Sequence, residues 1–188
     1  MTRGNQDIYV ATKKGKGIRF EETQVRAMGR TAAGVRAIKL ADDDEVVAMD
    51  ICGEGDILLT VTETGYGRKS LISDYRPQSR GGKGTTNYRT SLYGDVANVI
   101  CVNDDEDVIM IASNGVIIRI PVAEISTFTR PAKGVRVMRI PEGVKLLSVA
   151  TAAHDDAEVT DLPEAPEADA GDVGDLGETA ETEENDEE

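Results

Sequence analysis

The sequence contains few of the side chains that enzymes use for chemistry. Its one histidine, His154, stands close to the acidic C-terminal segment, which excludes a histidine base or a histidine-containing triad inside the fold. Two cysteines and one histidine are too few ligands for a structural zinc site. We therefore expect no catalytic residue, no metal and no cofactor in this region.

Long apolar runs are also missing. No segment approaches the ~20 consecutive apolar residues that a membrane helix needs. Residues 1–6 lack the apolar core of a signal peptide and lead directly into a strand-like segment. These two absences predict a cytoplasmic protein.

A glycine-rich stretch hints at a nucleotide-binding loop but lacks two of its residues. Pro77 stands where the first glycine of such a loop is required, and Gly84 follows Lys83 where serine or threonine is required. The tyrosines offer nucleophiles in principle, but Tyr75 occupies a repeat position that is otherwise apolar, which predicts a core residue. No enzymatic interpretation fits the residues present.

What the sequence does contain is an internal repeat of fifty residues, and it aligns without gaps. Glycines and apolar residues keep this spacing at Gly15, Gly65 and Gly115, at Gly34, Gly84 and Gly134, and at Ile8, Leu58 and Val108. A period near fifty with β-type content predicts an all-β, bladed, propeller-like architecture. We expect about three blades in an incomplete ring, with copies at about 1–45, 46–95 and 96–145 and a remnant strand at 146–153.

Each copy predicts about four short strands. We expect them at 7–12, 16–20 and 35–40, at 46–52, 57–62, 66–70 and 85–90, and at 96–102, 108–112, 116–120 and 135–140. Cys52 and Cys101 fall at nearly equivalent positions of different blades, so we expect buried free thiols.

Charge divides the chain into two parts. From His154 onward there are sixteen acidic residues and no lysine or arginine, whereas residues 1–153 hold nineteen acidic and twenty-one basic residues. The net charge of −14 therefore says nothing against a polyanionic partner for the first part. Residues 154–188 predict a disordered acidic tail, because they have too few large apolar side chains to offset the entropy of folding.

The glycine-rich stretch is itself a candidate anion-binding site. It combines flexible glycines, which let backbone N–H groups approach a ligand, with two cations, and its residues are Gln78, Arg80, Gly81, Gly82, Lys83 and Gly84. The third copy holds a weaker version that contains Lys133. The alternative is a basic surface turn without a ligand.

Basic residues also recur at matching repeat positions. Three sets are basic in every copy, namely Arg19, Lys69 and Arg119, then Arg30, Arg80 and Arg130, and finally Lys39, Arg89 and Arg139. Equivalent positions of a bladed fold lie at equivalent points of its edge, so these cations predict a curved positive track for the backbone of duplex DNA. Because aromatic residues make up only 4% of the chain, stacking of single-stranded bases is the less favoured mode. The alternative is that one charged residue per strand keeps each blade soluble.

The stretch from Gln78 to Gly84 resembles the box motif of the C-terminal domain of bacterial DNA gyrase A, with Ser79 where a basic residue is usual. The segments 8–15, 29–35 and 64–67 are similar to repeats of the same domain, and the acidic tail is similar to its C-terminal tail. The resemblance covers about residues 7–153. It implies a β-pinwheel that binds and wraps duplex DNA and supports ATP-dependent negative supercoiling by a type II topoisomerase.

Further expectations follow from this resemblance. Gln78 to Gly84 would be a secondary box in a later blade, and the chain would be the last blades of a six-bladed domain. The partners would be duplex DNA, the rest of gyrase A, and gyrase B, in a nucleoid-associated complex that holds two copies of each. ATP and magnesium would act elsewhere in that complex. The alternatives are the corresponding C-terminal domain of topoisomerase IV and a propeller-like scaffold for protein interactions.

Overall fold

The computed structural model describes residues 4–53, 56–130 and 132–154. The chain divides into a compact unit, Met1–Asp155, and a second unit, Asp156–Glu188. The expected disordered tail lies outside the described residues, except for His154 at its start.

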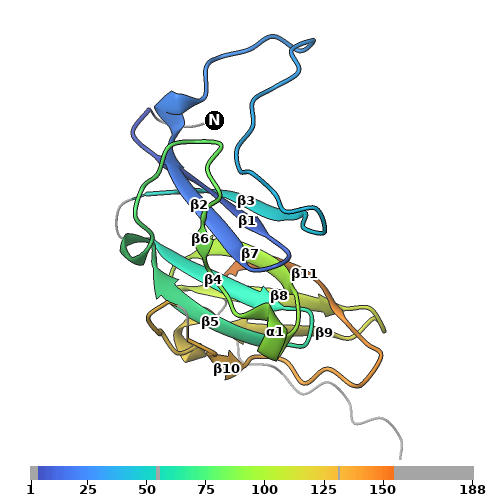
Figure 1. The fold of residues 1–188 in the computed structure, drawn as a ribbon. Coiled ribbons are helices and arrows are strands. Elements are labelled where there is room, and N and C mark those ends of the chain that lie inside the picture. The colour runs from blue at the N-terminus through green and yellow to red at the C-terminus, as the bar shows by residue number, and fades with distance from the viewer. Residues whose placement is uncertain (1–3, 54–55, 131, 155–188) are drawn as a thin grey trace, which may run out of the picture. The chain divides into compact units, whose positions relative to one another are not determined.

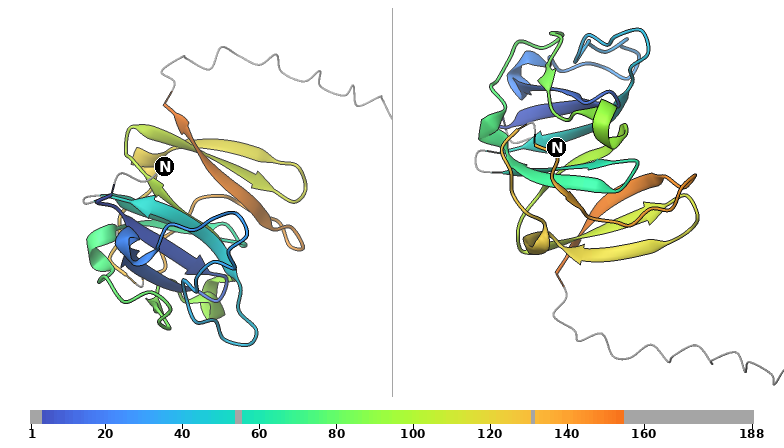
Figure 2. Two further views of the ribbon diagram at one scale, coloured as in Figure 1. Left: turned by 90° about the horizontal axis from the view of Figure 1, so that it is seen from above. Right: turned by 60° about the horizontal axis from the view of Figure 1, so that its bottom comes forward.

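Three antiparallel sheets follow one another along the compact unit (Figure 1). The strand orders are β3-β1-β2-β6, β10-β5-β4-β7 and β11-β8-β9. Two further views show the same succession of sheets, coloured from blue through green to yellow and orange (Figure 2). The strand bounds are β1 (Asp7–Thr12), β2 (Lys16–Glu21), β3 (Val46–Cys52), β4 (Ile57–Thr62), β5 (Tyr66–Leu71), β6 (Thr85–Thr86), β7 (Val96–Val102), β8 (Glu106–Ala112), β9 (Ile117–Pro121), β10 (Val135–Arg136) and β11 (Leu146–Ala153).

The helical elements among the described residues are short. Three 3-10 turns recur at the fifty-residue spacing, η1 (Glu22–Gln24), η2 (Ile72–Asp74) and η3 (Val122–Glu124), and the α-helix is α1 (Thr90–Tyr93). None of these described helices could span a bilayer.

The second and third repeats each contribute a strand to the sheet of the repeat before them. Thr85 and Thr86 of β6 pair with β2 of the first repeat, and Val135 and Arg136 of β10 pair with β5 of the second. The third sheet has no such fourth strand among the described residues. The all-β, bladed fold class predicted from the sequence is thus confirmed, with consecutive repeats joined by exchanged strands.

The boundaries expected for the copies differ from those of the observed sheets. The segment 46–52, expected to open the second copy, is β3 and pairs with β1 of the first sheet. In the same way β7 pairs with β4 and β11 pairs with β8. Each of these three strands is therefore the last strand of its repeat and not the first strand of the next one. The described chain thus holds three repeats, and residues 146–153 belong to the third of them and are not a remnant of a fourth.

The expected strand at 35–40 is wrong, and those at 85–90 and 135–140 are shorter than expected. Only Thr85–Thr86 and Val135–Arg136 are strands, and no strand forms between 25 and 45. The physical reason is that β6 and β10 form by pairing with the sheet of the repeat before them. The described residues contain no repeat before the first one with which 35–40 could pair.

The expectation of free thiols is also wrong. Cys52 at the end of β3 and Cys101 in β7 form a disulfide, with their Cα atoms 6.4 Å apart. They belong to different sheets, as expected, but β3 and β7 contact each other. Equivalent positions of neighbouring repeats therefore lie close together, which the expectation did not take into account.

The core lies between successive sheets. Tyr9 and Ala11 of the first sheet cluster with Tyr75 and Tyr88 of the second repeat, which confirms Tyr75 as a core residue. Leu59 and Val61 of the second sheet cluster with Met138 of the third repeat in the same way. One face of each of the first two sheets is thus covered by the repeat that follows.

Candidate nucleic-acid interface

The glycine-rich stretch is held against the first repeat by backbone hydrogen bonds. The N–H of Gly81 donates to the carbonyl of Ala37 at 2.7 Å, and the N–H of Lys39 donates to the carbonyl of Gly82 at 2.8 Å. The N–H of Gln78 donates to the carbonyl of Arg19 at 2.8 Å. The amides of Gln78 and Gly81 therefore already have protein partners and are not free to bind an anion, whereas anion binding by the rest of the stretch stays a prediction.

The glycines of this stretch allow its backbone to lie close to the first repeat. Gly84 has a φ of +68°, and a Cβ built there would lie 2.6 Å from the carbonyl oxygen of Gly17. Gly134, its equivalent in the third repeat, has a φ of +76° and a similarly obstructed Cβ position against Gly67. Glycine is needed here because two backbones approach closely, and this requirement is independent of any ligand.

Arg80 and Arg130 form equivalent hydrogen bonds between neighbouring repeats. Nη1 of Arg80 donates to the carbonyl of Arg36 at 2.6 Å, and Nη1 of Arg130 donates to the carbonyl of Thr86 at 3.1 Å. Arg130 also lies over the ring of Tyr75 at 5.5 Å. The two arginines thus occupy matching places, as predicted, but each guanidinium donates to a backbone carbonyl of the protein. Arg30 is exposed.

The set Arg19, Lys69 and Arg119 contradicts the expected free track of cations. Nε of Arg19 lies 2.5 Å from Oδ2 of Asp7, and Nε of Arg119 lies 2.6 Å from Oδ2 of Asp107. Lys69 is 3% exposed and pairs with Asp104. Lys69 lies on a sheet face that the following repeat covers, and each of the three cations is paired with a carboxylate, so this set holds the fold together.

Asp107 illustrates how tightly one of these pairs is held. Its carboxylate contacts Nδ1 of His154 at 2.6 Å as well as the guanidinium of Arg119. The hydrogen bond with His154, together with that from Arg119, holds the pKa of Asp107 below its ordinary value, although burial opposes the shift. Asp107 therefore stays ionised and ties β9 and the end of β11 to β8.

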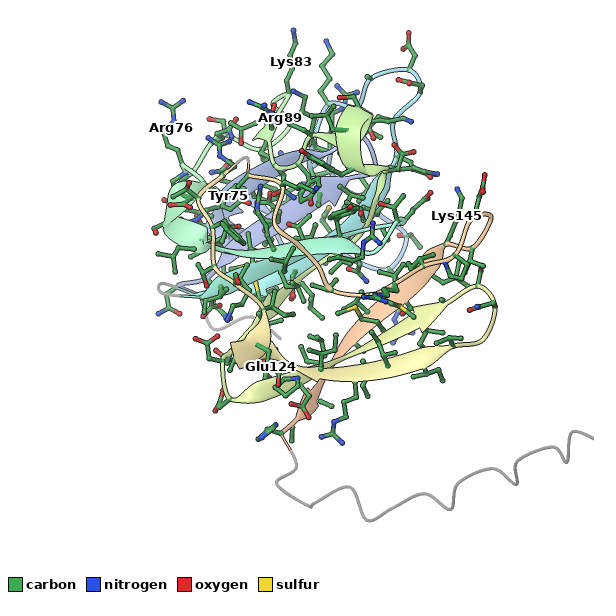
Figure 3. All side chains as sticks on the ribbon, turned by 90° about the horizontal axis from the view of Figure 1, so that it is seen from below. Tyr75, Arg76, Lys83, Arg89, Glu124 and Lys145 are labelled. Carbon is green, nitrogen blue, oxygen red and sulfur yellow. A yellow bond between two sulfur atoms is a disulfide. The ribbon has the colours of Figure 1, made fainter. Side chains whose placement is uncertain are left out.

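The exposed cations gather elsewhere, on the irregular segments that follow η1, η2 and η3. Lys39, Lys83, Arg89 and Arg139 are exposed, and within the described residues none of them has a carboxylate within ion-pair distance. Figure 3 shows Lys83 and Arg76 projecting away from the sheets. Together with Arg30 and Lys133, which are also exposed and have no carboxylate partner within the described residues, these are the sequence-predicted cations that remain available to a polyanion.

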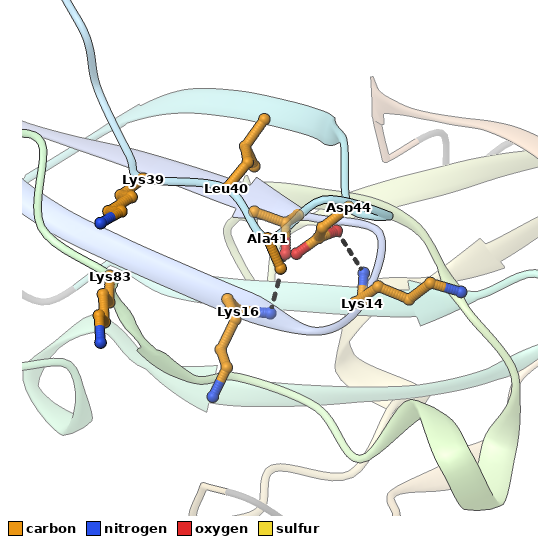
Figure 4. A pocket seen from close by; sticks show the side chains of 8 residues that line it. Lys14, Lys16, Lys39, Leu40, Ala41, Asp44 and Lys83 are labelled. Carbon is orange, nitrogen blue, oxygen red and sulfur yellow. Dashed lines mark hydrogen bonds between the residues drawn. The ribbon is translucent and has the colours of Figure 1, made fainter.

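A surface cavity of about 450 Å³ is lined by two of these cations and by a further exposed lysine. Lys16, Lys39 and Lys83 line it, and we call these three residues the lysine pocket (Figure 4). Nζ of Lys16 donates to the hydroxyl of Thr86 at 3.2 Å. Lys14 also lines the cavity, but its Nζ pairs with Asp95 at 3.1 Å.

The one carboxylate that lines the lysine pocket, that of Asp44, brings a single negative charge against three lysines and forms no ion pair with them. Oδ1 of Asp44 accepts hydrogen bonds from the backbone N–H groups of Lys14 and Glu45, each at 2.9 Å. Sequence reasoning missed Lys16, because the equivalent residues of the other repeats are Tyr66 and Val116 and no basic register marks the position.

The next junction between repeats carries a related cluster. Lys133, the equivalent of Lys83, lies over the rings of Tyr66 and Tyr93 at 4.7 and 5.2 Å. Nη2 of Arg136 donates to the hydroxyl of Tyr66 at 2.9 Å, and this bond lowers the pKa of Tyr66. Exposed cations thus recur at both junctions between described sheets.

A comparison with protein families identifies these repeats. The family model described as the DNA gyrase C-terminal domain, beta-propeller, matches three consecutive segments, residues 6–52, 56–103 and 106–153. The chain belongs to this family. Each match spans one gyrase-type repeat and ends with β3, β7 or β11, in agreement with the observed strand pairing.

Relatives and solved structures agree with the family. The chain is 40% identical over 159 residues to DNA gyrase A of Staphylococcus epidermidis and 39% identical over 167 residues to that of Staphylococcus aureus. These matches cover 83% and 87% of this chain but 18% and 19% of the relatives, so the chain spans about a fifth of their length.

Two solved domains share the gyrase-type fold. A structure of the DNA gyrase A C-terminal domain superposes with a TM-score of 0.72 at 27% identity, over 78% of this chain and 50% of that one. The crystal structure of the C-terminal domain of DNA topoisomerase IV gives a TM-score of 0.75 at 21% identity, over 81% and 48%. The second likeness concerns the fold alone, whereas the curated relatives at 39–40% identity are gyrase proteins.

Proposed function

We propose that the three repeats bind the phosphate backbone of duplex DNA as an accessory part of a type II topoisomerase. The observation that carries this proposal is the lysine pocket, where the side chains of three exposed lysines line one surface cavity and none of them forms an ion pair within the described residues. Clusters of like charge are costly unless an anion binds there, and nucleic-acid phosphate is the most abundant polyanion in a cell.

The contact is electrostatic and independent of base sequence. Phosphates that approach Lys16, Lys39 and Lys83 displace the counterions condensed on DNA, and Lys133 and Arg136 do the same at the next junction. Because both clusters lie where one repeat crosses onto the previous sheet, the bound duplex follows the succession of sheets. The glycine-rich stretch positions Lys83 through its bonds to residues 37 and 39.

Membership of the gyrase family supports the wider context. We place the chain in gyrase A, with gyrase B as a partner, in a complex that introduces negative supercoils. We place strand cleavage and the use of ATP and magnesium in other parts of that complex. Topoisomerase IV is the less favoured setting because the curated relatives at 39–40% identity are gyrase proteins.

The test is a titration of fluorescently labelled duplex DNA with the 188-residue chain across a series of salt concentrations. Affinity should fall with salt, with a log–log slope of about −0.9 for each phosphate neutralised. The double variant Lys39→Gln and Lys83→Gln should weaken binding about 30-fold, if each lost contact is worth about 1 kcal/mol. The slope should become shallower by roughly 2 in the same variant.

Lys145→Gln is the matched control. Its side chain is also exposed, but its Nζ already lies 2.7 Å from Glu63, and Figure 3 shows it apart from Lys83. Binding by this variant should equal that of the unaltered chain. If the 188-residue chain has no measurable affinity for duplex DNA at low salt, the proposed function is wrong.

A further inference from the structure

The first sheet is joined to the second repeat at both of its edges, and at one edge the link is covalent. β6 pairs with β2 at one edge, and β3 at the other edge contacts β7, which is itself the edge strand of the second sheet. The N–H of Cys101 in β7 donates to Oδ2 of Asp50 in β3 at 2.7 Å, and a disulfide joins Cys101 to Cys52. A carboxylate and a pair of sulfur atoms thus connect two strands that belong to different ladders.

The next junction lacks the residues for these two bonds. Fifty residues further on, Val102 stands in place of Cys52, Thr151 in place of Cys101, and Ile100 in place of Asp50. Valine and threonine cannot form a disulfide, and the side chain of isoleucine has no hydrogen-bond acceptor. β7 and β11 nevertheless contact each other. The contact between neighbouring repeats therefore does not require a covalent bond, and the cysteine pair is particular to the first junction.

The two sulfur atoms differ in their access to solvent. Cys52 is fully buried, whereas Cys101 is partly buried and lines a surface cavity of about 350 Å³. The rate of thiol–disulfide exchange depends on which sulfur a thiolate can approach. A small thiol that enters the cavity therefore reaches the sulfur of Cys101 first.

The cavity beside Cys101 is acidic. Asp50, Asp56 and Glu106 line it, and its lining within the described residues includes no lysine or arginine. A recess lined by charge of one sign concentrates small molecules of the opposite sign and repels those of the same sign. The cavity should therefore favour small thiols that carry a positive group over those that carry a negative one.

We propose that Cys52 and Cys101 form a reversible redox site, which small thiols open and small disulfides close through the acidic cavity. The site goes beyond the DNA binding proposed above and does not depend on it. A small thiolate attacks Sγ of Cys101, forms a mixed disulfide with it and expels the sulfur of Cys52, which takes up a proton. A second thiolate attacks the small-molecule sulfur of the mixed disulfide and expels Cys101, which also takes up a proton. Two small thiols become one small disulfide, two electrons and two protons pass to the protein, and the reverse reaction closes the bond.

The redox state should change the stability of the chain. The disulfide joins residues separated by 49 positions, and such a cross-link stabilises mainly by restricting the unfolded chain. The oxidised chain should therefore unfold at a higher urea concentration than the reduced chain. Cys101→Ser should unfold at the same urea concentration with and without reductant.

The decisive experiment compares how fast two small thiols of opposite charge reduce the folded 188-residue chain. Cysteamine carries an ammonium group and mercaptoethanesulfonate a sulfonate, and intact mass after alkylation of the free thiols follows the reaction. Each rate is expressed per thiolate and divided by the rate at which the same thiol reduces an uncharged small disulfide. The corrected rate with cysteamine should be roughly tenfold higher at low salt. The ratio should approach one at about 1 M salt, where charges are screened.

A matched pair of variants tests whether the acidic cavity is the route. Glu106→Gln should lower the ratio, because it removes one of three carboxylates but keeps a side-chain oxygen for the hydrogen bond from the N–H of Asn103. Glu124→Gln is the control, since Glu124 is exposed but does not line the cavity. Its ratio should equal that of the unaltered chain.

Three results would overturn the proposal. One is a chain whose two cysteines stay free thiols in an excess of small disulfide, and another is a disulfide that small thiols reduce only after urea has unfolded the chain. The third is an equal corrected rate with the two thiols, which would reject the acidic cavity as the route. Each result can be obtained without DNA, so it is distinguishable from failure of the proposed function.

Discussion

Arg68 is a fully buried guanidinium that has no carboxylate partner among the residues the structure describes. Its Nη2 donates to the carbonyl and the side-chain oxygen of Asn87 at 2.6 and 3.0 Å, and its Nη1 donates to the carbonyl of Ala132 at 2.8 Å. It also lies over the ring of Tyr88 at 5.2 Å. Arg68 thus joins the second sheet to the crossing segment of the third repeat. The other repeats have Ile18 and Ile118 at this position.

Replacing Arg68 should show whether its shape or its charge matters more. Arg68→Ala should lower the free energy of unfolding by about 3–5 kcal/mol, because it leaves a cavity and unpaired polar groups around Asn87. Arg68→Met should cost clearly less, since it fills the volume and no buried carboxylate is left behind. Urea unfolding of the two variants measures the difference, and equal losses would show that packing contributes little.

The recurrent arginines and lysines are also explained at the scale of single residues. Their threefold register was interpreted as a track for DNA, but Arg19, Lys69 and Arg119 recur because each forms an ion pair within the fold. Asp7 and Asp107, one hundred residues apart, are the sequence signal that could have revealed this. Lys16 shows the reverse, because a residue without basic equivalents lines the lysine pocket.

The element that joins the repeats is the crossing segment, and its last glycine offers a controlled series. Gly34, Gly84 and Gly134 all have positive φ, so replacing any of them by alanine strains the backbone by about 1 kcal/mol. Only at Gly84 and Gly134 would the new methyl group also collide with the backbone of the preceding repeat.

Gly84→Ala and Gly134→Ala should therefore lower the free energy of unfolding by roughly 1–3 kcal/mol more than Gly34→Ala does. Chemical denaturation of the three variants under one condition gives the comparison. Three equal losses would mean that the contact between repeats does not require glycine.

The sequence predicts those elements that depend on local patterns, but it does not predict those that depend on where a repeat begins or on a neighbouring repeat. The fifty-residue spacing and most hairpin strands were predicted, because they depend on local patterns such as Gly15 and Gly65 at the turns. The start of each repeat was not, because a periodic pattern is unchanged when its boundaries are shifted. The strand at 35–40 was wrong because strand formation there depends on a neighbouring sheet and not on the segment's own residues.

At the scale of the whole chain, the dominant feature is the separation of charge. A chain that ends at Asp155 keeps twenty-one basic and twenty acidic side chains, whereas the removed segment has fifteen carboxylates and no cation. We propose that this acidic segment competes with DNA for the exposed lysines and arginines of the repeats. Such competition acts through charge alone and needs no defined structure in the segment.

Ending the chain at Asp155 should therefore raise its affinity for duplex DNA at low salt, and the gain should shrink as salt screens the carboxylates. The shortened chain keeps His154, whose contact with Asp107 joins the end of β11 to β8. The matched control keeps the full length but carries asparagine and glutamine in place of the acidic residues after Asp155. It should bind DNA as tightly as the shortened chain if charge is the cause. Equal affinity of the shortened and unaltered chains at low salt would rule out competition by the acidic segment.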